Sequence, residues 1–265
     1  MNPDPTRPCL SVIIPAYNEE RTTRRILGRV LQLPNLLEVI FVDDCSTDGT
    51  AAIAQEMAAA DPRIRYMRHA TNGGKTEALK TGFAASVGEV VIVQDADLEY
   101  NPDEIPSVIE LILQGRADVV FGSRFQVRKA ARVLYYYHYL ANKSLTFLSD
   151  LFTNLNLTDV ETGYKAFRGE IIRDMVITSS GFGFEIEVTA KVSKLRCAIY
   201  EVPISYYGRT YEEGKKIGTK DGIAALWYIL YYNLMVSANR SYRNYSVLQQ
   251  GLTARAMAVP AEDAP

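Results

Sequence analysis

Three acidic residues alternate directly after a short apolar stretch, in the order VVIVQDADLE over residues 90–99. Carboxylate oxygens are hard ligands that suit Mg²⁺ or Mn²⁺, and these ions usually bind one or two carboxylates together with the phosphates of a substrate. We therefore predict that Asp95, Asp97 and Glu99 bind a metal and that a nucleotide diphosphate completes its coordination. A turn of solvated acids is the alternative, because an isolated Asp-x-Asp triplet is common by chance.

Two further acids, Asp43 and Asp44, follow the apolar stretch 38–42. Adjacent carboxylates at the end of an apolar strand repel each other in a dry site, so at least one should face a hydrogen-bond donor or a ligand. A nucleobase N–H or a ribose hydroxyl is such a donor. The pair is therefore compatible with a nucleoside as ligand, although a donor from the protein would serve as well.

A glycine-rich turn, Asn72-Gly73-Gly74-Lys75, opens a predicted helix. Backbone N–H groups at a helix start and the charge of Lys75 favour a phosphate. The turn lacks the spacing of a Walker motif, and a flexible helix entry is the competing explanation.

A basic and aromatic stretch covers residues 123–149, which contain no Asp or Glu. Arg124, Arg128 and Arg132 recur every four residues and would share one face if this stretch is helical. A solvated basic face is the ordinary explanation. The absence of compensating acids favours an anionic partner, either a lipid phosphate or a membrane surface.

These residues need elements to position them, and the chain alternates apolar strands with helices. We expect strands at 10–15, 38–42, 64–67, 90–93, 119–121, 163–167 and 198–205, and helices at 19–33, 48–60, 76–86, 102–113 and 185–194. This alternation predicts an α/β fold with a mostly parallel sheet and helices on both faces. Ligands of such sheets bind beyond the carboxyl ends of the strands, where the acids above lie.

Composition excludes several classes of protein. The 265 residues are 48% hydrophobic and 23% charged, which is ordinary globular usage and rules out a collagen-like or wholly disordered chain. The net charge of −2 argues against a uniformly basic nucleic-acid binder. The three cysteines form no CxxC pair and the N-terminus shows no secretory signal, so we expect a protein of the cytoplasm.

The motifs together resemble the family 2 glycosyltransferases, which have the GT-A nucleotide-diphospho-sugar transferase fold. The resemblance runs from residue 10 to about residue 216 through SVIIPAYNEE, VDDCSTDGT, NGGKTEALKTGF, DADLE, FGSR, TDVETGYKAFR and EVPISYYGR. It implies a nucleotide-sugar site formed by Pro15, Ala16, Tyr17, Glu19, Asp44, Lys75, Asp95, Ala96 and Asp97.

Within that family the sequence looks most like the polyprenyl-phosphate glycosyltransferases of the dolichyl-phosphate mannose or glucose synthase type. The resemblance implies an inverting, metal-dependent hexosyltransferase that takes UDP-glucose as first choice or GDP-mannose as second. The acceptor is then a polyprenyl phosphate at the cytoplasmic face of the cell membrane. A soluble saccharide or protein acceptor is the alternative, and a receiver-like signalling module, suggested by the acid pairs, is a weaker one.

The resemblance also assigns the acceptor side of the site. It places Arg124 on the acceptor phosphate and Asp159 near the reacting atoms, in preference to Glu161. Asp97, Arg124 and Asp159 are thus the expected catalytic residues. Lys215 and Lys216 lie in a loop that would close over the diphosphate, and with Arg124, Arg128 and Arg132 they make up the expected acceptor-binding set.

The C-terminal region carries the apolar run 222–238, which is short of the roughly 20 residues that span a membrane. Tyr and Trp residues within it and basic residues beside it favour a helix in the plane of the membrane interface. Packing on the core or in an oligomer contact is the alternative, which leaves a homo-oligomer open. We expect a catalytic domain at 9–216, this amphipathic helix at 217–245, and a flexible tail at 246–265.

Overall fold

A seven-stranded sheet forms the centre of the molecule, with strand order β3-β2-β1-β4-β6-β5-β7. The computed structural model describes residues 7–126, 135–181, 183–208 and 219–258. The strands are β1 Leu10–Ala16, β2 Leu36–Asp43, β3 Ile64–Arg68, β4 Val90–Val93, β5 Val119–Ser123, β6 Lys165–Arg168 and β7 Ile199–Pro203. All neighbouring pairs are parallel except those of β6, which is antiparallel to β4 and β5. The expected α/β fold with a mostly parallel sheet is confirmed.

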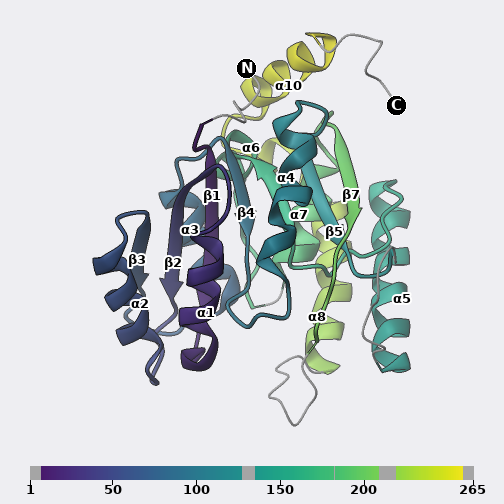
Figure 1. The fold of residues 1–265 in the computed structure, drawn as a ribbon. Coiled ribbons are helices and arrows are strands. Elements are labelled where there is room, and N and C mark those ends of the chain that lie inside the picture. Colours follow the sequence, from purple (N-terminus) through teal and green to yellow (C-terminus); the bar gives the residue numbers. More distant parts are fainter. Residues whose placement is uncertain (1–6, 127–134, 182, 209–218, 259–265) are drawn as a thin grey trace.

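Helices cover both faces of the sheet (Figure 1). Those before β7 are α1 Glu20–Val30, α2 Thr50–Ala60, α3 Lys75–Ala85, η1 Pro102–Glu104, α4 Ile105–Leu113, α5 Tyr136–Thr153, α6 Gly169–Asp174 and α7 Phe184–Val192. Those after it are α8 Thr219–Leu230, the π-helical turn η2 Tyr231–Met235, α9 Ala238–Ser241 and α10 Tyr245–Ala258.

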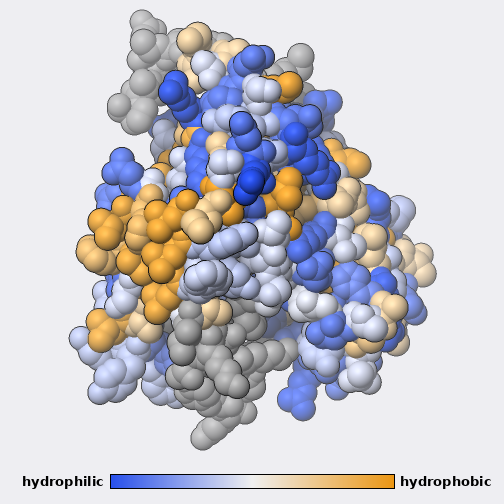
Figure 2. Space-filling view, turned by 180° about the vertical axis from the view of Figure 1, so that it is seen from behind, coloured by the Kyte–Doolittle hydropathy of each residue, from blue (hydrophilic) through white to orange (hydrophobic). Residues whose placement is uncertain are grey.

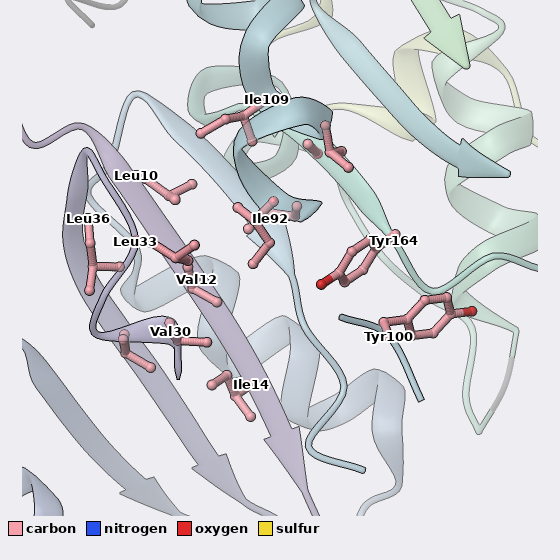
Figure 3. Close-up of a cluster of buried hydrophobic side chains, with 14 of the residues drawn as sticks. Leu10, Val12, Ile14, Val30, Leu33, Leu36, Ile92, Tyr100, Ile109 and Tyr164 are labelled. Atoms are coloured by element: carbon pink, nitrogen blue, oxygen red, sulfur yellow. The ribbon is translucent and has the colours of Figure 1, made fainter. Parts of the chain in front are cut away.

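Alternation along the strands divides the core into two layers. In β1, Val12 and Ile14 pack toward α1 and α4, as Figure 3 shows for that layer, whereas Ile13 packs toward α3 and α7 on the other face. The strands β1, β2 and β4 are therefore buried on both sides, which explains their nearly continuous apolar sequences. The polar residues that end the strands lie at one edge, because β1 to β5 and β7 all run in one direction.

The C-terminal region differs from the expectation of one helix followed by a tail. The helix ends at Met235, since Val236 is extended, and α9 follows. Residues 245–258 form α10, whose Leu248 and Leu252 are buried in the same layer as α6. The predicted flexible tail is thus wrong for residues 246–258, because two leucines four residues apart give the segment an apolar face that packs on the core.

The inner side of α8 joins a small core of its own. Ala225 and Ile229 pack with Val160 and Ile186, and side chains of α5 complete the cluster. No helix of the described ranges has both the length and the apolar character that crossing a bilayer requires.

Candidate functional site

The turns after β1 and β2 are linked by hydrogen bonds at the carboxyl edge of the sheet. The Asn18 amide donates to Ser46 Oγ at 3.0 Å, and the Glu19 amide donates to Thr50 Oγ1 at 2.8 Å. Pro15 and Ala16 are buried at the end of β1, whereas the ring of Tyr17 is exposed. The first turn of the expected nucleoside site is therefore held by contacts between the two loops.

Both acids of the Asp43–Asp44 pair have protein partners. Asp43 accepts hydrogen bonds from the Ser46 amide (2.8 Å) and the Tyr66 hydroxyl (2.9 Å). Asp44 accepts from the amides of Gly73 (2.9 Å) and Gly74 (2.7 Å), and its Oδ1 lies 2.7 Å from His69 Nδ1. Repulsion between the two carboxylates is thus offset within the protein.

Asp44 also shapes the glycine-rich turn. Gly74 has a φ of +85°, a conformation that residues with a Cβ rarely adopt, and it directs its amide to the carboxylate. The turn then delivers Lys75 to the first residue of α3. The structure therefore places Asp44 directly against the glycine-rich turn that we expect to meet a phosphate.

Lys75 lies between two carboxylates at the end of β4. Its Nζ is 3.0 Å from Asp95 Oδ1 and 3.0 Å from Glu185 Oε1 at the start of α7. Burial lowers the pKa of Lys75, but the two carboxylates outweigh it and hold that pKa well above its ordinary value. A permanent cation therefore stands beside the expected diphosphate position.

The expected metal triad is not assembled as predicted. The carboxylate of Glu99 accepts a hydrogen bond from the Tyr206 hydroxyl at 2.6 Å. Over the described part of the chain, no three His, Cys, Asp or Glu side chains are grouped so that they could hold a metal. Asp95, whose carboxylate also pairs with Lys75, and Asp97 lie just after β4, and two carboxylates with the phosphates of a nucleotide sugar suffice for Mg²⁺ or Mn²⁺. The two carboxylates of Asp95 and Asp97 thus fit such an ion without Glu99.

Arg124 and Asp159 form a buried pair at the end of β5. Arg124 Nε and Nη2 donate to the two oxygens of Asp159 at 2.6 and 2.7 Å, and the Arg124 amide adds a bond of 3.1 Å. Asp159 is fully buried. Burial lowers the pKa of Arg124, but Asp159 raises it well above its ordinary value. Two expected catalytic residues are therefore brought into direct contact.

Further contacts fix the loop that carries Asp159. Glu201 of β7 accepts from the amides of Thr158 (2.9 Å) and Asp159 (3.2 Å). From α5, Lys143 Nζ donates to the Thr158 carbonyl at 3.0 Å, and Thr146 Oγ1 accepts from the Val160 amide at 3.2 Å. Sequence reasoning missed Glu201, although an acid inside the otherwise apolar strand IYEVP is a visible signal.

Glu161 and Glu185 both direct a buried carboxylate oxygen, Oε1 and Oε2 respectively, to a position where the described residues offer no hydrogen bond. Burial, and after it the charge of Glu185, raise the pKa of Glu161 to about 7. Burial also lowers the pKa of the neighbouring Lys165 to about 8. Glu185 and Lys165 were missed by the sequence reading, and the paired acids that open α7 were the available signal for Glu185.

Tyr100 connects the two sides of this site. Its hydroxyl accepts from the Gly163 amide at 2.9 Å, and its ring stacks on Tyr164 with centroids 4.8 Å apart (Figure 3). A Cβ at Gly163 would lie 2.7 Å from Asp95 Oδ2 and 3.0 Å from Tyr100 Cε2, so a larger residue there would displace one of these side chains. The Asp95 and Asp159 regions are therefore contiguous.

Four predicted basic residues, Arg128, Arg132, Lys215 and Lys216, lie outside the described residues. Arg124 itself lies in a bend, and α5 begins only at Tyr136. The helical face expected to begin at Arg124 is therefore not found at that residue.

Exposed apolar side chains gather over α5 and over α8 with η2, as the orange surface at the left of Figure 2 shows. On α5 they include Tyr136, Tyr137, Leu140, Phe147 and Leu151, and on α8 with η2 they include Leu226, Trp227, Leu230, Leu234 and Met235. The two helices pack together on their inner sides. We call this surface the α5–α8 face.

Comparison with known proteins adds relatives to this geometry. Residues 11–176 match the sequence model of glycosyl transferase family 2. The chain is similar to undecaprenyl-phosphate mannosyltransferase of Micrococcus luteus, with 32% identity over 81% of this chain and 94% of the relative. It is also similar to polyprenol monophosphomannose synthase of Mycolicibacterium smegmatis, with 30% identity over 78% of this chain and 81% of the relative.

A third relative is dolichol-phosphate mannosyltransferase of Pyrococcus furiosus, 32% identical over 79% of this chain but only 59% of its own length. Among solved structures, glucosyl-3-phosphoglycerate synthase of Mycobacterium tuberculosis aligns with a TM-score of 0.65 and 20% identity, over 87% of this chain and 82% of that one. The same enzyme has been crystallised with Mn²⁺ and uridine diphosphate. At this identity the likeness shows the fold.

Proposed function

Because the chain belongs to glycosyl transferase family 2, we propose that it transfers a hexose from a nucleotide-diphosphate sugar to a polyprenyl phosphate. Because the chain belongs to this family, the alternative of a receiver-like signalling module, which the acid pairs suggested, is excluded. The observation that carries the proposal is the buried Arg124, held by Asp159 and contiguous with the Asp95–Lys75–Glu185 cluster. A cation for the acceptor thus lies beside a cluster suited to the donor.

The donor we propose is GDP-mannose, the second choice of the sequence reading, in place of UDP-glucose. The support is that three curated relatives at 30% identity or more are named as mannosyltransferases or as a phosphomannose synthase. The uridine nucleotide bound by the structural neighbour belongs to a protein only about a fifth identical, so it does not decide the nucleobase.

Asp95 and Asp97 are the residues we propose to hold Mg²⁺ or Mn²⁺. Such an ion supplies positive charge to a departing diphosphate. Lys75 adds a fixed cation on the same side, since its pKa lies well above its ordinary value. With the ion bound, its charge and that of Lys75 would lie where negative charge develops during transfer.

The acceptor needs orientation more than deprotonation. A phosphate monoester has a second pKa of about 6, so it arrives with an ionised oxygen. That oxygen forms the new bond to the anomeric carbon while the bond from this carbon to the donor diphosphate breaks, and the diphosphate leaves with the electron pair. Asp159 binds Arg124 through both of its oxygens, so we propose that it holds the guanidinium toward the acceptor phosphate instead of removing a proton.

The α5–α8 face is the surface we propose to meet the membrane, on its cytoplasmic side. Tyr and Trp favour the boundary between lipid and water, and this face exposes both. Lys143 and Thr146 of α5 hydrogen-bond the loop that carries Asp159. A lipid whose chain lies along this face would therefore bring its phosphate to the Arg124 side of the site.

Steady-state kinetics of Arg124→Ala with a short polyprenyl phosphate test the acceptor assignment. Loss of one charge-assisted contact predicts a fall of about 10- to 100-fold in kcat/KM for the acceptor, with little change in the donor KM. Arg124→Lys keeps the charge but loses the bidentate geometry, so its kcat/KM for the acceptor should lie between those of wild type and Arg124→Ala. Arg24→Ala, an exposed arginine paired with Glu56, is the matched control. A raised donor KM with an unchanged acceptor KM would contradict the assignment.

A further inference from the structure

The segment that follows β7 crosses the loop that carries Asp97 and Glu99. Tyr206 forms an isolated antiparallel bridge with Tyr100, and the Tyr207 amide donates to the Glu99 carbonyl at 2.8 Å. The rings of Tyr100 and Tyr206 lie with centroids 5.2 Å apart. The two segments are therefore joined by backbone pairing and by ring contact.

The side chain of Tyr206 contacts both halves of the site. Its hydroxyl donates to Glu99 Oε2 at 2.6 Å. The Cζ atom of Arg124 lies 5.1 Å from the centroid of its ring, within the range of a cation–π interaction.

These contacts fix the guanidinium of Arg124 in complementary ways. Asp159 binds two of its nitrogens and so sets its orientation within its own plane. The ring of Tyr206 supports it through a different contact, and the ring is itself anchored by Tyr100 and Glu99. We call residues 94–101, which carry Asp95, Asp97 and Glu99, the donor-side loop. Tyr206 touches Arg124 at one end and this loop at the other, and so sets the separation of the two.

We propose that Tyr206 is a positioning residue that holds the Arg124 guanidinium through its ring and the donor-side loop through its hydroxyl. The two ends of the reaction are thereby kept at a fixed separation. The inference rests on the proposed function for the role of Arg124, whereas the link to the loop stands on the geometry alone.

Three variants separate the ring from the hydroxyl. Tyr206→Leu removes both and should raise the acceptor KM about 2- to 30-fold, the range that a partly desolvated cation–π contact supports, without changing the donor KM. Tyr206→Phe keeps the ring and should restore the acceptor KM. Tyr207→Leu, a change at the neighbouring exposed tyrosine, should leave both constants unchanged.

Hydrogen exchange tests the hydroxyl in Tyr206→Phe. Loss of the bond to Glu99 should speed exchange in the 96–101 segment about tenfold, whereas Tyr207→Leu should not. Unchanged exchange in Tyr206→Phe would overturn the link. This arm also decides the case if Tyr206→Leu does not fold.

A double-mutant cycle separates this inference from the proposed function. If Tyr206 acts through Arg124, then Tyr206→Leu should cause no further loss of acceptor kcat/KM in an Arg124→Ala background. Additive losses would overturn the positioning role. An Arg124→Ala protein with wild-type acceptor kcat/KM would instead contradict the proposed function, and the exchange experiment would still decide the link to the loop.

Discussion

The carboxyl group of Glu161 gives the site a pH dependence that the structure explains. Burial and the nearby Glu185 raise the pKa of Glu161 to about 7, whereas a glutamate in the unfolded chain titrates near 4.3. Between these values the folded state binds more proton than the unfolded state, so the free energy of unfolding falls as pH rises and stays lower above about pH 7. Glu161→Gln removes this effect.

Between pH 5 and pH 8 we expect the free energy of unfolding of Glu161→Gln to rise by about 2 kcal/mol relative to that of wild type. Chemical denaturation at the two pH values measures the difference. Glu110→Gln makes the same change on the exposed side of α4 and serves as control. A constant difference between Glu161→Gln and wild type across this pH range would contradict the raised pKa.

A second residue-scale prediction concerns Asp97, one of the two carboxylates proposed to hold the metal. Asp97→Asn should lower transfer by about 100-fold or more, because an amide is a poorer ligand for a hard cation. The fold should persist, since Asp97 lies beyond the end of β4 and is only partly buried. Transfer rates over a Mn²⁺ titration measure the effect, with the exposed Asp103→Asn as control. A wild-type rate of transfer in Asp97→Asn would contradict the proposal that Asp97 holds the metal.

Single residues also show where sequence reasoning stops. The position of Arg124 after a strand could be predicted, but its pairing with Asp159 could not, because the partners are 35 positions apart and meet only through the sheet. Glu99 alternates correctly with Asp95 and Asp97, yet its carboxylate bonds to Tyr206, more than a hundred residues away in the chain. The alternation of residues predicts on which side a side chain lies, but it does not predict which residue that side chain bonds to.

Among the elements, α8 and η2 carry the prediction about the membrane. Leu230 and Leu234 are exposed on the α5–α8 face, while Ile229 and Tyr232 pack inward. Replacing both leucines by Glu should release the protein from vesicles of phosphatidylglycerol and phosphatidylcholine, because charge opposes insertion into the interface. Donor binding should be unchanged.

Sedimentation with these vesicles measures the effect. The matched control places the same two charges at Val247 and Met257, which are exposed on α10. Wild-type protein that stays in the supernatant at every salt concentration would refute the membrane contact.

The helix α10 was not predicted from the sequence. Substitutions on its buried and exposed sides test whether packing on the core stabilises it. Leu252 is buried and Val247 is exposed on the same helix. Leu252→Ala should lower the free energy of unfolding by about 2–4 kcal/mol, as for other buried leucines, whereas Val247→Ala should change it by less than about 0.5 kcal/mol. Urea unfolding distinguishes them, and equal effects would show that the helix does not depend on this packing.

Strands were easier to predict than the later helices for a physical reason. The β-branched runs of β1, β2 and β4 are buried on both faces, so their apolar character is continuous and visible. By contrast, α5 and α8 bury one side and expose apolar residues on the other, which hides the usual amphipathic pattern. The exposed side is the part that we assign to the lipid surface.

At the scale of the whole molecule, the strand order separates the residues that we propose for the two substrates. The proposed donor residues lie at the ends of β1, β2 and β4, whereas the proposed acceptor residue Arg124 follows β5. In the sheet, β6 lies between these two groups of strands. The mostly parallel sheet could be predicted from the alternation of strands and helices. The antiparallel β6 could not, because its direction depends on the connections around it.

Transfer of mannose from GDP-mannose to a polyprenyl phosphate, the function that we propose for this chain, can be measured directly. Purified protein is incubated with Mn²⁺, a radiolabelled nucleotide sugar and a polyprenyl phosphate, and the label is then followed into an organic extract. We expect lipid-soluble label with GDP-mannose and far less with UDP-glucose, and none when the polyprenyl phosphate is omitted. Label that remains in the aqueous phase on a saccharide or protein acceptor, with no product in the organic extract, would contradict it.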